Sequence, residues 1–90
     1  MRYLLVLDRR SEVGAMYESG SNDGHIRAGD LLHPVLDCTE VITDASHYVF
    51  ATRDMKKKGK SDQSIYVPHS SVVYIHCYAD EGTKPVGFVA

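Results

Sequence analysis

The amino-acid sequence predicts a small, mostly β protein, and two observations support this. In the stretch Ile65–Tyr78, two strongly β-prone runs are separated only by the four residues Pro68–Ser71. Proline has no N–H to donate to a sheet, so Pro68 should end the first run, and the serines after it can turn the chain into the second. Short apolar runs also recur about every 8–12 residues, with turn residues between them. This spacing is typical of a barrel or sandwich, and the sharply bent strand pair favours a small, strongly curved barrel.

The N-terminal part of the chain begins with an aliphatic, partly alternating run at residues 2–8, which predicts a first strand. The segment 13–18 has two interpretations. Ser11 could cap a short helix there, although Gly14 argues against a long one, and a second short strand paired with the first is the alternative. Residues 20–24 combine glycine, serine, asparagine and aspartate, and we expect a flexible surface loop.

The middle of the chain should contain three strands, at residues 31–36, 40–43 and 47–52, with turns at 37–39 and 44–46. Pro34 marks the first of these as an edge strand or as the site of a bulge. A polar hairpin loop follows at residues 53–63, and the bent pair occupies 64–78. We expect a turn at 80–83 and a last edge strand at 86–89.

Length, composition and charge restrict the classes of function. Ninety residues make one small domain, 1–90, whose core is marginal without staples or partners. Cys38 and Cys77 match no metal or redox spacing, so we expect two buried free thiols in a reducing compartment, with a disulfide as the alternative. The apolar run at the N-terminus is too short for a secretory leader and no run could span a membrane, so a cytoplasmic location is expected. The formal net charge of −2 means that any nucleic-acid binding must come from a local basic patch or from stacking.

A resemblance to a known family rests on the bent pair. Ile65–Val67 is an apolar strand, Pro68–Ser71 a tight turn, and Val72 and Ile75 are hydrophobic positions three residues apart. This is similar to the second sequence motif of the Sm/LSm family, and Asp44–Phe50 resembles the aspartate-led loop and strand of the first motif, one residue short. The resemblance covers roughly residues 29–78 and is greatest to the divergent Sm-like proteins of marine cyanophage type.

The resemblance implies a five-stranded, highly bent Sm-like (SH3-like) barrel, here with an extra N-terminal element. It also implies a homo-oligomeric ring, in which the fourth strand of one subunit pairs with the fifth strand of the next. Rings of about five to seven copies are expected, with a pentamer first. Residues 72–78 are apolar on both strand faces, which independently favours a subunit contact that removes exposed edges. The expected interface residues are Ile65, Val67, Val73, Ile75 and Cys77.

The resemblance further implies a nucleic-acid site, where bases stack on a residue of the loop before the third strand. On this chain the matching positions are His47, Tyr48, Pro68, His69 and Ser70. Pro68 and His69 stand where the family has arginine and glycine, which weakens the case for uridine specificity. The alternative interpretation is that Tyr48 packs inside the barrel and His69 only caps a turn.

One basic patch is expected, formed by Arg53, Lys56, Lys57, Lys58 and Lys60. Repeated around a ring, it would bind phosphate backbones in a salt-dependent way that is indifferent to sequence. The alternative is a solvated hairpin tip whose lysines prevent edge-to-edge aggregation.

Catalytic and metal chemistry are not expected. The histidines show no spacing typical of metal ligands, although a ring could gather one from each subunit, and no nucleophile, base and orienting group are placed together. The sequence therefore predicts a protein without cofactor, metal or enzymatic activity that forms a ring and binds RNA or single-stranded DNA. The alternative is a structural or protein-interaction ring without nucleic acid, of phage origin and acting in the host cytoplasm.

Overall fold

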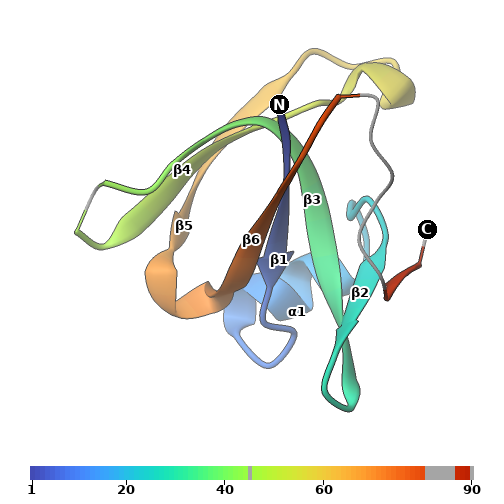
Figure 1. Cartoon of the computed structure of the whole chain (residues 1–90), viewed down its shortest axis with the longest axis vertical. Coiled ribbons are helices and arrows are strands. Elements are labelled where there is room, and N and C mark those ends of the chain that lie inside the picture. Colours follow the sequence, from blue (N-terminus) through green and yellow to red (C-terminus); the bar gives the residue numbers. More distant parts are fainter. Residues whose placement is uncertain (45, 81–86, 90) are drawn as a thin grey trace.

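The computed structural model describes residues 1–44, 46–80 and 87–89 and is mostly β, with one short α-helix (Figure 1). The elements are β1 (Arg2–Leu7), α1 (Glu12–Glu18), β2 (His25–Ala28), β3 (Leu31–Ile42), β4 (Tyr48–Arg53), the 3-10 turn η1 (Lys56–Lys58), β5 (Gln63–Pro68), the 3-10 turn η2 (His69–Ser71), β6 (Val72–Tyr78) and β7 (Phe88–Val89).

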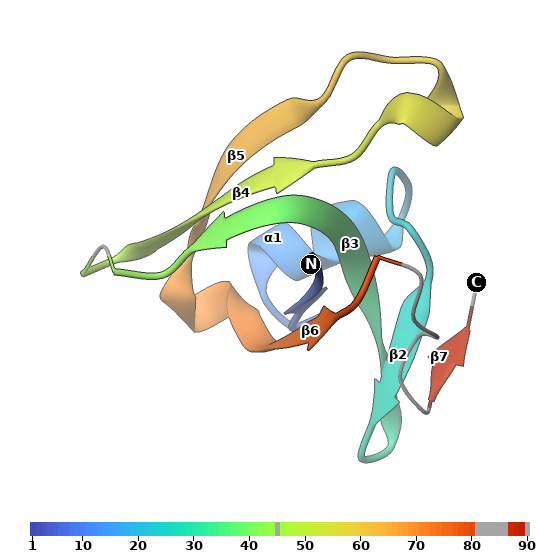
Figure 2. The same cartoon turned by 45° about the horizontal axis from the view of Figure 1, so that its top comes forward.

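The strands form a curved antiparallel sheet in the order β5-β4-β3-β1-β6. β2 pairs with the first part of β3, and β7 pairs with β2. Figure 2 shows how strongly β3 curves and how η2 links β5 to β6 at one end of the sheet. Within the described residues β5 pairs only with β4, and β6 only with β1, so the sheet stays open between its two end strands.

β1 lies inside the sheet and is covered on both faces, which explains its continuous aliphatic sequence. Leu5 and Leu7 belong to one cluster of buried side chains, whereas Leu4 and Val6 belong to another. The other buried members of the first cluster are Leu36, Cys38, Val49, Ala51 and Val67. Those of the second are Ile26, Val35 and Tyr78, against which Phe88 of β7 packs.

The ambiguous segment after β1 is a helix. Ser11 is its N-cap, because the Gly14 N–H donates to the Ser11 Oγ at 3.0 Å. Gly14 does not end the helix but allows it to lie against the preceding chain, since a Cβ at this position would lie 1.8 Å from the Asp8 carbonyl oxygen.

The prediction of two strands separated by a turn at 37–39 was wrong, because β3 is one continuous strand. It bends at a register shift between Cys38 and Glu40 in its pairing with β4, which is the signature of a bulge. Pro34 is tolerated because the ladder to β1 reaches only as far as Val35, so its missing N–H breaks none of those pairs.

The other elements agree with the sequence predictions to different degrees. β1, β4, β5 and β6 lie within a residue or two of the expected strands, and β7 falls inside the expected edge strand at 86–89. β2 was missed. Ala45 of the expected turn at 44–46, most of the turn at 80–83, and Val86 lie outside the described residues.

Candidate nucleic-acid interface

The outer surface of the β4–β5 pair is aromatic. Alternation along β4 buries Val49 and Ala51 and turns Tyr48 and Phe50 outward. Phe50 is directly opposite Tyr66 of β5, and these two ring centroids are 5.2 Å apart. The Tyr48 and Tyr66 rings meet edge to face at 6.5 Å. Tyr66 is 70% exposed and Tyr48 49% exposed.

Ile42 of β3 lies opposite Phe50 and is also exposed. We call these four side chains, Ile42, Tyr48, Phe50 and Tyr66, the aromatic face. A polar row follows one step along the strands, where Glu40, Thr52 and Ser64 are cross-strand neighbours. The Thr52 Oγ1 lies 3.3 Å from the Ser64 Oγ. The aromatic face therefore ends on side chains that can exchange hydrogen bonds.

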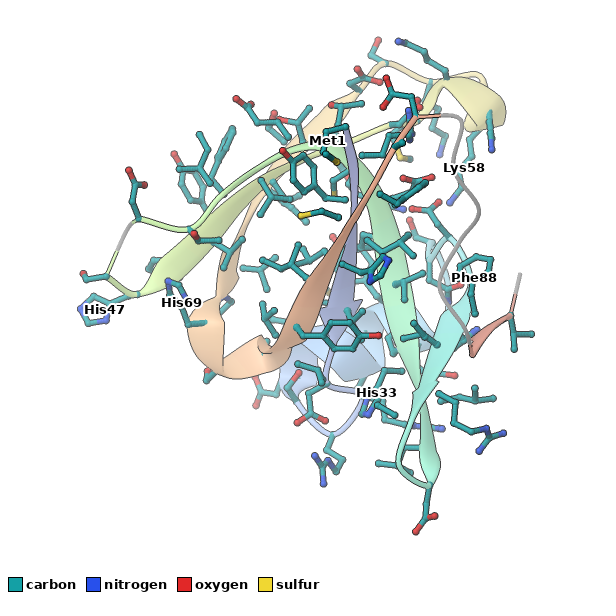
Figure 3. The ribbon with its side chains drawn as sticks, viewed as in Figure 1. Met1, His33, His47, Lys58, His69 and Phe88 are labelled. Carbon is teal, nitrogen blue, oxygen red and sulfur yellow. The ribbon has the colours of Figure 1, made fainter. Side chains whose placement is uncertain are left out.

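One end of the aromatic face adjoins the expected stacking site. His47, Tyr48, His69 and Ser70 are all exposed, and the His69 N–H donates to the His47 carbonyl oxygen at 3.0 Å. Tyr48 is paired with Pro68, so the structure brings these four residues together, and Figure 3 shows His47 and His69 at the same end of the sheet. The alternative in which Tyr48 packs inside the barrel was wrong, because Tyr48 is on the outward side of β4.

The lysine loop lies at the other end of the same strand pair. We use this name for Lys56, Lys57, Lys58 and Lys60, which are all exposed and lie on or beside η1. The buried Met55 anchors this loop. Figure 3 shows Lys58 far from His47 and His69, which lie at the opposite end. Because β4 has six residues at about 3.3 Å each, the two groups are separated by roughly 20 Å.

Arg53 does not belong to the basic patch, which corrects the sequence prediction. It has the same strand parity as Val49 and Ala51, so its side chain points inward and is 0% exposed. The guanidinium donates to the Ser21 carbonyl oxygen at 2.7 Å and to the Asp23 carboxylate at 3.2 Å.

Arg53 also lies over the Tyr17 ring, with its Cζ 5.5 Å from the ring centroid. The loop at 20–24, which the sequence predicts to be flexible, is thus held by a buried cation. The Asp37 N–H adds a hydrogen bond of 2.8 Å to the Asp23 carboxylate.

A polar pocket of about 180 Å³ lies beside this network. Its lining residues are Arg2, Asn22, Asp23, Asp37, Asp54, Lys57 and Lys58. The three carboxylates and three cations balance in charge, and most are already paired.

Arg2 donates to the Asp54 carboxylate at 2.6 Å and to that of Asp37 at 3.3 Å. The hydrogen bond from Arg2 holds the pKa of Asp54 below its usual value. The Tyr78 hydroxyl donates to Asp37 at 3.0 Å. The pKa of Tyr78 is raised mainly by burial and, to a smaller extent, by this hydrogen bond. The charged groups of the pocket therefore neutralise one another. The described residues also include no group of three or more His, Cys, Asp or Glu side chains that could hold a metal ion.

The expected subunit-interface residues divide into three kinds. Val67 is 1% exposed and belongs to the chain's own core, which corrects the prediction that it faces a neighbour. The Val67 side chain is on the inward face of β5, which explains its burial. Ile65 and Ile75 pack partly against the same core. Val73 and Cys77 of β6 are exposed.

The two cysteines are free thiols, as predicted, but they differ in burial. Cys38 is buried in the first core, and burial raises its pKa to about 12. The expectation that both are buried was wrong for Cys77, because β6 is an end strand of the sheet.

The comparisons with known proteins found no matching family model, no similar curated protein and no similar solved structure. Among the described residues, no helix has the length and apolar character needed to cross a membrane.

Proposed function

We propose that this protein is an Sm-like barrel that assembles head to tail into a closed ring and binds single-stranded RNA or DNA without catalysing a reaction. The observation that supports it best is the position of the two end strands. β5 and β6 are the outer strands of the sheet path, and η2 joins them directly. The stretch that carries the resemblance to the Sm family, Ile65–Tyr78, spans this link.

Each end strand has a row of backbone groups without a sheet partner among the described residues. Such edges tend to pair with another chain. If β5 of one copy pairs with β6 of the next, every copy uses one edge of each kind, and a ring that closes leaves no free edge. Val73 and Tyr74 of β6 are 39% and 38% exposed, so the contact would also cover apolar surface.

The lysine loop supplies the attraction for phosphate. Four lysines lie within five residues, and ring assembly repeats them on every subunit. Because the chain as a whole has a net charge of −2, binding must be local and should weaken steeply with salt. A second candidate is a structural or protein-binding ring without nucleic acid, which the net negative charge and the Pro68 at the family's arginine position favour.

The first experiment measures assembly and binding together. We expect multi-angle light scattering to give a mass several times that of one chain. Val73→Asp should lower it to the monomer, because a charge cannot be buried unpaired in the strand contact. Met16→Asp is the matched control, since Met16 is 62% exposed on α1 and belongs to neither end strand.

Fluorescence anisotropy of labelled single-stranded RNA and DNA of about 16 nucleotides then tests binding at about 50 mM salt. A wild-type monomer would contradict the ring. An assembled protein that binds neither oligonucleotide would contradict the nucleic-acid function and favour the structural ring.

A further inference from the structure

We propose that the aromatic face is a platform on which unpaired bases of a single strand stack, while the strand's phosphates extend toward the lysine loop. This inference rests on the proposed function and names the part of the surface that reads bases. It adds Ile42, Phe50 and Tyr66 to the stacking site that the resemblance implies at His47, Tyr48, Pro68, His69 and Ser70.

The exposure of the rings is the first support. Tyr66 lies in the middle of β5, yet 70% of the side chain is open to solvent. Its two aromatic neighbours meet it at interplanar angles of 83° and 60°, so neither is stacked parallel upon it. Because most of the Tyr66 side chain is open to solvent, a flat ligand can reach the ring. Every nucleobase offers a π-face, so this kind of recognition tolerates any sequence.

The surroundings of the face indicate which flat ligand it fits. Exposed lysines lie at the end of the strand pair next to the polar row, and the exposed His47 and His69 lie at the other end. The face itself thus connects the two groups that are separated by roughly 20 Å along β4. A single strand has both flat bases and negative phosphates, the two kinds of group that aromatic rings and cations bind.

The polar row supplies the remaining chemistry. The hydroxyls of Thr52 and Ser64 and the carboxylate of Glu40 adjoin the rings. Such groups can exchange hydrogen bonds with the edge of a stacked base. An apolar peptide or a second copy packed on this face would use neither the row nor the lysines, so single-stranded nucleic acid is the occupant that uses all three features.

The test compares three variants for binding to the same single-stranded oligonucleotide. Tyr66→Ala should weaken binding by about 5- to 150-fold, the equivalent of removing one base–ring stack. Tyr66→Phe should restore most of the affinity because it keeps the ring. Met16→Ala is the control for loss of exposed apolar surface elsewhere. The dependence of affinity on salt should be the same in all of them, since none removes a cation.

A second readout does not depend on how well the alanine variant folds. The chain has no tryptophan, so Tyr66→Trp introduces a single fluorophore into the face. Single-stranded oligonucleotide should quench its fluorescence, and duplex DNA, whose bases are already stacked, should quench it far less.

The outcomes separate this inference from the proposed function. If the wild type binds and Tyr66→Ala binds equally well, with no quenching in Tyr66→Trp, the platform is wrong and the lysine loop alone explains binding. If Tyr66→Ala changes only the particle mass, the face is a contact between copies and the platform is again wrong. If the wild type binds no single strand, both proposals fail together.

Discussion

Arg53 and the lysine loop lie within eight residues of each other, yet the structure uses their charges in opposite ways. Arg53 points into the fold, where it is fully buried and bonded to Ser21 and Asp23. The lysines are exposed, and among the described residues only the Lys58 ammonium forms an ion pair with a carboxylate, at 3.3 Å from Asp23. The comparison teaches that a basic cluster in a sequence can divide into a cation that stabilises the fold and cations that are available to a ligand.

The largest expected effect comes from removing the buried cation. Arg53→Ala should lower the free energy of unfolding by about 3 kcal/mol or more, because the Ser21 carbonyl oxygen and the Asp23 carboxylate would lose their buried cationic partner. Urea unfolding measures this. Lys57→Ala is the matched control and should change stability by less than about 0.5 kcal/mol. If both variants lost the same free energy of unfolding, Arg53 would not differ from the lysine loop in its contribution to stability.

A smaller effect is expected from the pH dependence of the ionic network. The hydrogen bond from Arg2 lowers the pKa of Asp54 in the folded chain below the ordinary value of 3.8. A carboxylate with a depressed folded pKa stabilises the fold above its unfolded pKa, and this contribution is lost as the pH falls from about 4 through the folded value.

The urea midpoint of the wild type should therefore fall more steeply below pH 4 than that of Asp54→Asn. The lysine loop offers a comparison, because Lys60→Gln should leave the slope below pH 4 unchanged. Parallel curves for the wild type and Asp54→Asn would show that this ion pair does not stabilise the fold.

The difference between the buried Arg53 and the exposed lysines could be predicted only in part from the sequence. Val49, Ala51 and Arg53 share one strand parity, so alternation alone indicates that Arg53 points inward. The same rule places Val67 in the core. The inward orientation of Arg53 is still hard to predict, because the residue lies at the end of β4 next to lysines. Its partner Asp23 also lies thirty residues away in sequence.

The fold shows the same limit. The two strands on either side of η2 have local signals in Pro68 and the serines after it, and these signals are sufficient to predict where the first strand ends and the second begins. The sequence predicts two strands in place of β3 because Asp37–Thr39 is polar enough to suggest a turn. The continuity of β3 depends on a bulge opposite β4 and on the hydrogen bonds that Asp37 accepts from Arg2 and Tyr78. Such long-range contacts have no local signature.

The aromatic face was only partly visible in the sequence. The resemblance to the Sm family points to Tyr48, but Phe50 and Tyr66 belong to different strands, and the register of these strands brings the two rings together. No spacing rule connects them before the pairing of β4 with β5 is known. The face is a property of the sheet and not of either strand.

The most direct test of the central claim is the dependence of single-strand affinity on salt, for the wild type and for a variant with all four loop lysines changed to glutamine. We expect a linear fall of log affinity with log salt in the wild type. The slope should be shallower in the variant by about 0.7 for each phosphate that the lysines neutralise in the wild type, with urea stability unchanged. A variant with the same slope and affinity as the wild type would contradict the account, because the lysine loop would then not touch the strand.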